Sequence, residues 1–394
     1  MVVRIFEGNC LDVLRTLPER SVHVCVTSPP YWGLRSYSTQ PQIWGGRGDC
    51  EHSWASFKRP GTTGGTASAK TCIKCNAWRG ELGSEPTPDL FIENLVLIFR
   101  EVRRVLRNDG TLWVNFGDSY YSAASNQNGI GLHGSVNGGN TEMGRRRALA
   151  RHATLKQKDL CMMPARLALA LQTDGWYLRS AITWCKTAPM PESVTDRPTN
   201  ATEMIYLLSK QRSYYYDMDA IRVEQKCEWW NKAVNVDGTK IVADRKDGGN
   251  LQGTGNTAGR NLWNYWVLPP EQFNGAHFAA FPTEIPRRAI LAGTSARGAC
   301  AKCGASHVRV LKGTAWQPSC AHGADVTACT VLDPFFGAGT TGLVADQLGR
   351  DCIGIELNPD YAEIARQRIV SDAPMFTTVD GKSVQLDLFG ECIK

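Results

Sequence analysis

The tetrad Ser28-Pro29-Pro30-Tyr31 combines a hydroxyl, two proline carbonyls and an aromatic ring in four consecutive residues. It follows residues 22–26, a β-branched run that predicts a buried parallel strand. Prolines lack an N–H and constrain the preceding residue, so the strand must end here in a stiff, extended turn. Open α/β sheets bind ligands at this end of a strand, and a planar base with an amino group fits the tetrad. A proline-rich strand exit that only turns the chain is the alternative.

A second turn that could bind a ligand lies near the other end of the chain. Residues 330–332 predict a strand, residues 333–341 read Asp-Pro-Phe-Phe-Gly-Ala-Gly-Thr-Thr, and the strand after the next helix ends at Glu356. Glycines let a backbone approach a ligand closely, and an acid at that position accepts hydrogen bonds from ribose hydroxyls. The turn lacks the third glycine of a dinucleotide fingerprint and the lysine of a phosphate loop. It therefore suits a nucleoside without phosphates, such as S-adenosylmethionine.

Two groups of cysteine and histidine are spaced like metal ligands. Their members are Cys50, His52, Cys72 and Cys75 in the first group, and Cys300, Cys303, Cys320 and His322 in the second. Each group offers three thiolates and one imidazole, as a structural zinc site requires. Coincidental clustering is the alternative, and two complementary sets in one chain count against it. We expect each group to bind zinc and to staple an insertion that has no obvious core of its own.

A basic run free of acids lies between residues 143 and 158. Its cations are Arg145, Arg146, Arg147, Arg151, Lys156 and Lys158. Contacts to DNA phosphates are the favoured role of this run, with a solvated flexible loop as the alternative. Residues 217–275 show no clean period, but aromatic side chains are interspersed among basic and amide groups, which suits a nucleic-acid surface. Each of these aromatics, taken singly, is explained equally well as part of a core.

The elements that must position these residues alternate between strand and helix. Residues 3–7 predict a strand, an amphipathic helix begins at Asp12, and the strand 22–26 follows, which is the unit of a parallel sheet. Asp12 is either the N-cap of that helix or a ligand for an amino group. A long helix with apolar residues at helical spacing precedes a strand at residues 111–116, and a short helix spans residues 284–291.

Length and composition describe an ordinary globular protein. The 394 residues can hold one large domain with insertions or two domains, and 42% of them are hydrophobic and 21% charged. The net charge of +6 permits nucleic-acid binding without requiring it. No apolar run is long enough to span a membrane, and the N-terminus lacks the apolar core of a signal peptide. We therefore predict a cytoplasmic protein, in which the 14 cysteines argue against a disulfide framework.

The tetrad together with Trp32 resembles the catalytic motif of the DNA amino-methyltransferases, which methylate exocyclic nitrogens of cytosine or adenine. Residues 333–341 closely resemble the cofactor motif of the same family. The catalytic motif comes first in the chain, an order similar to that of the permuted beta-type subgroup. Four further segments have counterparts in the family's pattern, namely residues 8–12, 91–118, 182–186 and 277–282.

The resemblance implies roles for individual residues. Ser28, Pro29, Pro30 and Tyr31 would hold the target base, and Asp12 would lie near the adenine of S-adenosylmethionine. Glu356 would hold the ribose and Phe281 would close the pocket. The remaining residues expected to line the cofactor are Asp333, Phe335, Phe336, Gly337, Gly339, Thr340 and Thr341.

The fold class implied is a doubly wound α/β methyltransferase with a mostly parallel sheet and zinc-ribbon-like insertions. We expect the catalytic core to comprise residues 1–36, 86–216 with a basic loop at 122–158, 276–295, and 329–394, the last with the cofactor site. The two zinc-binding insertions are expected at residues 37–85 and 296–328, and a target-recognition region at residues 217–275.

The reaction implied is direct methyl transfer to the exocyclic amine of a base flipped out of double-stranded DNA. N4 of cytosine is favoured, because in the resembled family a serine at the first tetrad position accompanies cytosine more often than adenine. N6 of adenine is the alternative. A catalytically idle DNA-binding module and an RNA or protein amide methyltransferase stay open as further alternatives. A cognate restriction enzyme is an open second partner, and the sequence leaves the oligomeric state open.

Overall fold

The structure is a computed structural model that describes residues 1–34, 39–58, 66–121, 152–224, 259–271, 281–310, 315–372 and 378–383. The basic residues Arg145, Arg146, Arg147 and Arg151 lie outside the described residues, and so does most of the predicted target-recognition region. Among the described helices, none is both long and apolar enough to cross a membrane.

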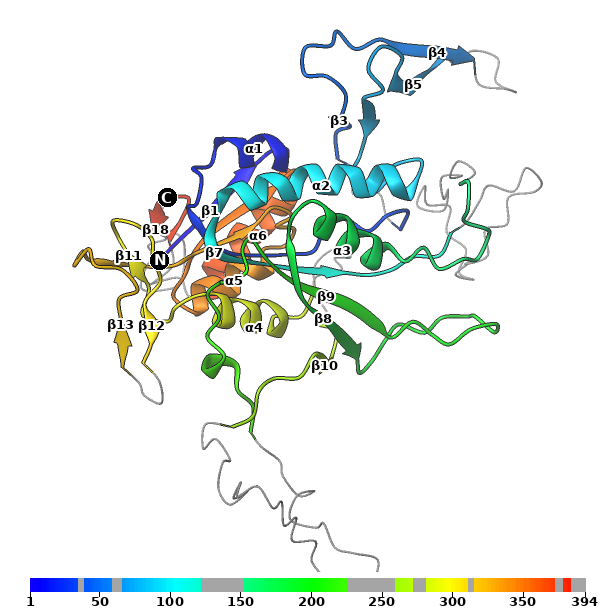
Figure 1. Ribbon diagram of the computed structural model, residues 1–394. Helices are drawn as coiled ribbons and strands as arrows, with labels where there is room; N and C mark the ends of the chain where they lie inside the picture. The colour runs from blue at the N-terminus through cyan, green and yellow to red at the C-terminus, as the bar shows by residue number, and fades with distance from the viewer. Residues whose placement is uncertain are drawn as a thin grey trace, which may run out of the picture.

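A ten-stranded sheet forms the centre of the protein (Figure 1). In order across the sheet, the strands are β10 (Tyr265–Leu268), β8 (Tyr177–Lys186), β9 (Thr202–Ser209), β7 (Leu106–Phe116), β2 (Val22–Thr27), β15 (Thr330–Asp333), β16 (Asp351–Glu356), β1 (Val2–Glu7), β17 (Thr378–Val379) and β18 (Lys382–Ser383). Strands β9 and β18 pair antiparallel with their neighbours, and the other pairings are parallel. The mostly parallel sheet expected from the sequence is confirmed.

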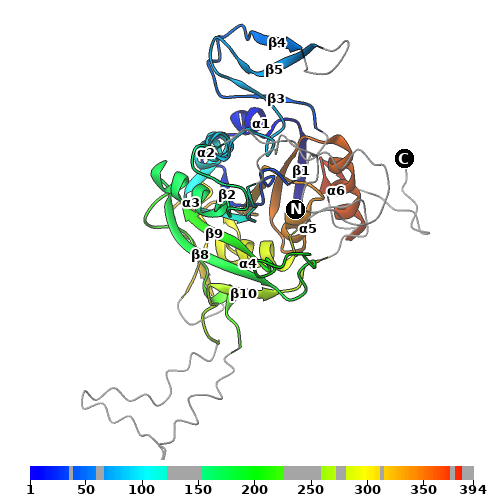
Figure 2. The same cartoon turned by 90° about the vertical axis from the view of Figure 1, so that its right-hand side faces the viewer.

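Helices cover both faces of the sheet (Figure 2). One face carries α1 (Cys10–Thr16), α2 (Pro88–Val105) and α3 (Met163–Thr173), and the other carries α4 (Glu284–Gly293), α5 (Thr340–Gln347) and α6 (Pro359–Asp372). All six residues of β2 are buried. Cys25 packs in the core beneath α2, whereas Val24 and Val26 pack in the core beneath α4 and α5. Successive side chains of a strand point to opposite faces, so a central strand covered on both sides is apolar throughout.

The sheet brings the chemistry-bearing turns to one edge. The tetrad follows β2, the glycine turn follows β15, and Glu356 ends β16, and these three strands are parallel neighbours. Their carboxyl ends therefore meet at one edge of the sheet, where open α/β sheets bind ligands. Strand β9 runs the other way, so its first residues also lie at this carboxyl edge.

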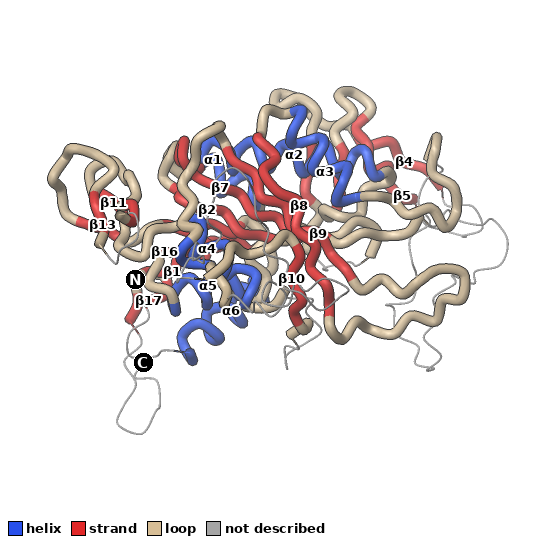
Figure 3. The backbone as a smooth tube through the Cα atoms, turned by 60° about the horizontal axis from the view of Figure 1, so that its bottom comes forward, coloured by secondary structure: helices blue, strands red, loops and turns tan. Residues whose placement is uncertain are grey.

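Two small modules project from opposite ends of the molecule (Figure 3). The first module contains a four-stranded sheet of β3 (Gln42–Trp44), β6 (Trp78–Gly80), β5 (Thr66–Cys72) and β4 (Trp54–Lys58). The second module contains the pairs β11 (Ala299–Cys300) with β14 (Val326–Thr327) and β12 (Val308–Arg309) with β13 (Trp316–Gln317). The first module is inserted just after the tetrad, and the second lies between α4 and the start of β15, at the amino edge of the sheet.

Differences from the sequence-based expectations include the cap of helix α1 and the existence of strand β10. Helix α1 is capped by Asn9, whose side chain accepts a hydrogen bond from the Leu11 N–H at 2.8 Å, so an N-cap role for Asp12 is wrong. Strand β10 was not expected, because its four residues are too few to show a period between irregular flanks. It nevertheless places Trp266 in the core, stacked on Trp113 with ring centroids 6.3 Å apart.

Candidate active site and metal centres

The Asp333 carboxylate joins the tetrad strand to the glycine turn. One oxygen accepts a hydrogen bond from the Thr27 hydroxyl at 2.6 Å, and the other accepts one from the Thr341 hydroxyl at 2.7 Å. The Phe335 N–H donates a third bond at 3.0 Å. Burial raises the pKa of Asp333 to about 6. The carboxylate therefore lies beneath the turn, where it fixes the end of β2 relative to the end of β15.

The glycine turn leaves room for a ligand on its open side. Gly337 has a φ of +51°, and a Cβ added there would meet no atom within 4 Å. Its N–H points to Glu356, whose Oε2 accepts the bond at 2.7 Å, and burial raises the pKa of this carboxyl. Gly339 has another role, because a Cβ there would lie 2.8 Å from Ala365 of helix α6. Gly337 thus leaves space for a ligand beside the turn, and Gly339 lets helix α6 pack closely against it.

Of the other predicted cofactor residues in the turn, one is half-buried and the other three are buried and support the turn from within. Phe335 is half-buried, whereas Phe336 is buried between Gly342 and Gly354, whose absent side chains make space for its ring. The buried Thr340 and Thr341 hydroxyls bond within the protein, to Arg368 and Asp333 respectively. The direct role of these residues in cofactor binding stays a prediction.

Two predicted cofactor residues lie on other segments. Asp12 is in the first turn of α1, where its side chain is 73% exposed and lies 3.6 Å from the Arg15 guanidinium. Phe281 is buried in the core on the α4 side of the sheet. Their contacts with a cofactor also stay predictions.

The tetrad packs closely at the carboxyl edge of the sheet. Pro29 and Trp32 are buried, whereas Ser28 and Tyr31 are half-buried. The Tyr31 ring makes an edge contact with Phe116, with ring centroids 5.3 Å apart. Ser28 Oγ lies 3.5 Å from the Tyr31 hydroxyl. The tetrad therefore offers a hydroxyl and an aromatic ring side by side.

Three polar residues behind Tyr31 were not identified from the sequence. The Tyr31 hydroxyl donates to Glu203 at 2.6 Å, and Asn115 Nδ2 donates to both the hydroxyl and Glu203. Lys186 Nζ lies 2.6 Å from the other oxygen of Glu203. Asn115 and Lys186 lie near the carboxyl ends of expected strands, a signal that could have identified them. Glu203 has no such signal, because it begins a strand that runs the opposite way.

Each predicted set of metal ligands comes together in the structure. Within each set of four, the ligand atoms all lie within 4.8 Å of one another. In the first set, a hydrogen bond from the Arg47 backbone lowers the pKa of the Cys75 thiol. In the second, a hydrogen bond from the Cys303 backbone lowers the pKa of the Cys300 thiol to about 6. The shifts are not uniform, since desolvation raises the pKa of the Cys50 thiol to about 11. Three sulfurs and one imidazole at this spacing nevertheless fit a zinc ion in each set, which binds cysteine as the thiolate.

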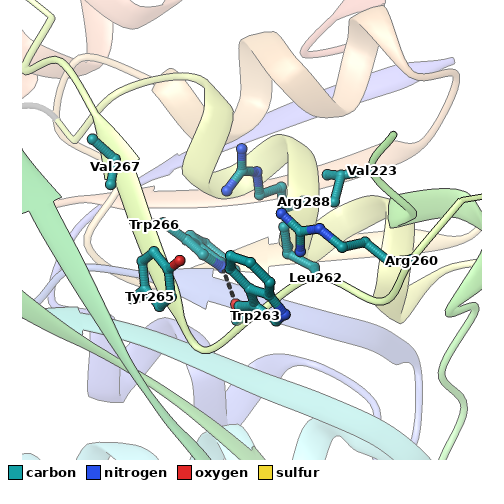
Figure 4. A pocket seen from close by; sticks show the side chains of 8 residues that line it. All are labelled: Val223, Arg260, Leu262, Trp263, Tyr265, Trp266, Val267 and Arg288. Carbon is teal, nitrogen blue, oxygen red and sulfur yellow. Dashed lines mark hydrogen bonds between the residues drawn. The ribbon is translucent and has the colours of Figure 1, made fainter. Parts of the chain in front are cut away.

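The described part of the expected DNA surface contains exposed cations and aromatics. Lys156 and Lys158 are exposed, and each forms an ion pair, with Asp159 at 3.3 Å and Asp196 at 2.6 Å. Figure 4 shows an open pocket of ≈ 210 Å³ beside β10, in which Arg260 lies over the Trp263 ring with its guanidinium carbon 3.6 Å from the ring centroid. The pocket is lined by Val223, Arg260, Leu262, Trp263, Tyr265, Trp266, Val267 and Arg288.

Known proteins resemble this chain over most of its length. A family model described as DNA methylase matches residues 22–367. The chain is 37% identical over 367 residues to the Type II methyltransferase M.Cfr9I of Citrobacter freundii, an alignment that covers 93% of this chain and 87% of that protein. It is 34% identical over 376 residues to the Type II methyltransferase M.SmaI of Serratia marcescens, covering 93% of this chain and 90% of that protein. The solved structure of the PvuII DNA methyltransferase (cytosine-N4-specific) has a TM-score of 0.51 at 14% identity, covers 97% of each chain, and shares the fold.

Proposed function

The chain belongs to the DNA methylase family, and from this we propose that it transfers a methyl group from S-adenosylmethionine to the N4 amino group of cytosine in double-stranded DNA. The observation that carries this proposal is the pair of hydrogen bonds from Thr27 and Thr341 to Asp333. These bonds hold the tetrad and the glycine turn next to each other at one edge of the sheet. A base bound at the tetrad would therefore lie close to a nucleoside bound at the glycine turn.

The residues at the glycine turn fit S-adenosylmethionine. The open space above Gly337 would take the ligand, and Glu356, which ends the next strand, would accept hydrogen bonds from the ribose hydroxyls. Phe335, half-buried beside the turn, would contribute an apolar contact. When bound, S-adenosylmethionine supplies an electrophilic methyl group on a positively charged sulfur.

The tetrad residues would prepare the amine for attack. An exocyclic amine is a poor nucleophile, because its lone pair is delocalised into the ring. Hydrogen bonds from the amine to the Ser28 hydroxyl and the Pro29 carbonyl would favour a pyramidal nitrogen with a free lone pair. These bonds strengthen as the nitrogen becomes pyramidal, so they would lower the barrier more than they improve binding. Tyr31 would stack on the base and keep it in place outside the duplex.

The choice of cytosine rests on the serine that opens the tetrad. Ser28 is half-buried at the tip of β2, with a short neutral side chain that can accept one N–H bond. Adenine presents a similar amino group, so N6 methylation of adenine is the outcome that would replace this assignment.

The DNA would be held by surfaces outside the tetrad. Arg260 and Trp263 offer a cation stacked on an exposed ring, an arrangement that suits phosphate and base contacts. The exposed Lys156 and Lys158 would add phosphate contacts, as would the arginines outside the described residues. A cognate restriction enzyme that shares the recognition site is the proposed second partner, because the relatives are named Type II methyltransferases. We also propose that the protein acts in the cytoplasm, because its DNA substrate lies there.

We further propose that each module holds one structural zinc ion. The first would be bound by Cys50, His52, Cys72 and Cys75, and the second by Cys300, Cys303, Cys320 and His322. The described residues of each module form no large apolar core of their own, so the metal would supply folding free energy directly.

The proposed reaction is tested by methylating DNA with labelled S-adenosylmethionine, digesting the product to nucleosides and separating them by mass spectrometry. Labelled N4-methylcytosine is expected, and Ser28→Ala should lower the turnover far more than the cofactor affinity. N6-methyladenine without N4-methylcytosine would overturn the choice of base. No label in DNA, with a folded protein that binds the cofactor, would overturn the proposed function.

A further inference from the structure

Two polar side chains, Asn115 and Glu203, hydrogen-bond to the Tyr31 hydroxyl, and Lys186 pairs with Glu203. The reaction proposed above assigns these three residues no role. Asn115 is near the end of β7, Lys186 ends β8, and Glu203 is near the start of β9. Because β9 runs antiparallel to both neighbours, all three side chains reach the carboxyl edge of the sheet. We call these three residues the anchor cluster.

The anchor cluster is a closed set of hydrogen bonds. Glu203 Oε2 accepts from the Tyr31 hydroxyl at 2.6 Å and from Asn115 Nδ2 at 2.8 Å, and Oε1 accepts from Lys186 Nζ at 2.6 Å. Asn115 Nδ2 also donates to the Tyr31 oxygen at 3.0 Å. Asn115 Oδ1 is buried and has no hydrogen-bond partner among the described residues. The two bonds from Nδ2 therefore fix the orientation of this amide.

The ion pair between Lys186 and Glu203 is largely buried, and strand pairing alone does not explain it. The Glu203 side chain is 12% exposed and that of Lys186 is 22% exposed. Removing two charges from water is unfavourable, and pairing offsets this cost without clear net stabilisation. Apolar residues would serve strand pairing equally well. The charge is therefore better explained by its contact with the hydroxyl of Tyr31.

The Tyr31 ring is confined on its other sides by backbone and an aromatic ring. Phe116 meets it edge to face, and a Cβ on Gly117 would lie 2.5 Å from the ring. The close approach of Gly117 leaves the ring no room to shift toward β7. The Tyr31 hydroxyl is also hydrogen-bonded to Glu203 and Asn115. The plane of the ring is therefore fixed before a base binds.

We propose that Asn115, Lys186 and Glu203 are positioning residues that hold the Tyr31 ring in the plane in which it stacks on the flipped base. This inference rests on the proposed function. Methyl transfer places positive charge on the base, and a tyrosine whose hydroxyl donates to a carboxylate presents a more electron-rich face to that charge. Positioning and charge act together in the transition state, so loss of the anchor cluster lowers the rate of transfer and leaves cofactor binding intact.

A double-mutant cycle tests this proposal. Single-turnover methyl transfer is measured with saturating DNA and S-adenosylmethionine for the wild type, Tyr31→Phe, Glu203→Gln and the double variant. Each single change should slow transfer about tenfold to a hundredfold, the range expected for a charge-assisted hydrogen bond. In the Tyr31→Phe background, Glu203→Gln should slow transfer by less than about twofold more, because no tyrosine hydroxyl is left for the carboxylate charge to act on. Cofactor affinity measured by calorimetry should stay within about twofold of the wild type in all of them.

Glu101→Gln is the matched control, because Glu101 also lies 2.6 Å from a cation, Arg104, near the C-terminal end of helix α2. It should transfer methyl groups at the wild-type rate. If Glu203→Gln does not fold, Asn115→Ala replaces it in the same cycle, since it removes the other bond to the Tyr31 hydroxyl.

Multiplicative slowing in the double variant, or a wild-type rate in a folded Glu203→Gln protein, would overturn the anchor role. These results require a wild type that methylates DNA. A folded wild type that transfers no methyl group would instead contradict the proposed function.

Discussion

The two modules that carry the proposed zinc ligands share the same ligand types, three cysteines and one histidine, and lie at opposite edges of the sheet. The first module is joined to the tetrad at the carboxyl edge, where the Gly33 N–H donates to the Gly83 carbonyl at 2.9 Å and the Trp32 indole donates to the Glu85 carbonyl at 3.1 Å. A Cβ on Gly83 would lie 3.2 Å from the Tyr31 carbonyl oxygen. The loop that closes the first module is therefore part of the wall behind the tetrad.

The second module is docked at the amino edge, on the far ends of the same strands. The His23 ring lies between the Gly304 carbonyl and the Thr330 N–H, each 2.9 Å from a ring nitrogen. Arg107 donates to the Cys303 carbonyl at 2.7 Å. No contact of this kind joins the described part of the second module to the tetrad. A metal in the first module would therefore support the shape of the proposed active site, whereas a metal in the second would support the stability of the sheet.

The largest expected effect is loss of metal. Purified protein should contain close to two zinc ions per chain, and Cys75→Ser and Cys303→Ser should each remove one, because the remaining three ligands cannot complete a tetrahedral structural site. Metal analysis by mass spectrometry measures the content. Each loss should also lower the unfolding midpoint by about 5 °C or more. A metal-free preparation with full stability and activity would show that neither set of ligands is a zinc site.

The Asp333→Ala substitution tests the carboxyl edge of the sheet at a residue that lies outside both modules. Asp333→Ala removes three hydrogen bonds that fix the glycine turn and the tetrad strand. S-adenosylmethionine affinity should fall about a hundredfold, or ~2.7 kcal/mol. Calorimetry measures the affinity, and zinc content should stay at the wild-type value. Unchanged affinity in a folded Asp333→Ala variant would contradict the role given to this carboxylate.

The docking of the second module should depend on pH. Burial lowers the pKa of His23 to about 4, whereas an unfolded histidine keeps its usual value near 6.5. Above pH 6.5 both states are neutral, and as pH falls from 6.5 to 4 the unfolded chain gains a proton that the folded chain does not. Stability is therefore lost over this window, by up to roughly 3 kcal/mol.

The His23→Gln variant provides the control for this pH dependence, because glutamine does not titrate. The free energy of unfolding by denaturant is measured between pH 5 and 8 for both proteins. The wild type should lose more stability toward pH 5 than the variant does. Equal losses would show that His23 does not couple this module to the sheet.

The sequence predicted the parts of the site that lie within single segments. The tetrad, the glycine turn and both metal-ligand sets are local patterns, since prolines, glycines and cysteines at fixed spacing constrain the nearby backbone directly. The alternating strands and helices likewise indicated the parallel sheet, because period-two and helical patterns depend on neighbouring residues.

The features that could not be predicted join segments far apart in the chain. Glu203 meets Tyr31 only because β9 is inserted antiparallel between β7 and β8. His23 looked like any other residue of a buried strand, and its contact with Gly304 depends on where the second module docks. The burial of Asp333 beneath the turn depends on the pairing of β2 with β15. Such contacts follow from the order of strands in the sheet, which local patterns do not determine.

The most direct test of the contrast between the modules compares Cys75→Ser with Cys303→Ser under conditions where both are folded. Single-turnover methyl transfer to DNA and the unfolding midpoint are measured for each variant at the same temperature, well below both midpoints. Cys75→Ser should slow transfer at least about tenfold, because the wall behind the tetrad loosens, whereas Cys303→Ser should transfer within about twofold of the wild type despite its lower midpoint. Equal slowing in the two variants, or slower transfer in Cys303→Ser, would contradict the account.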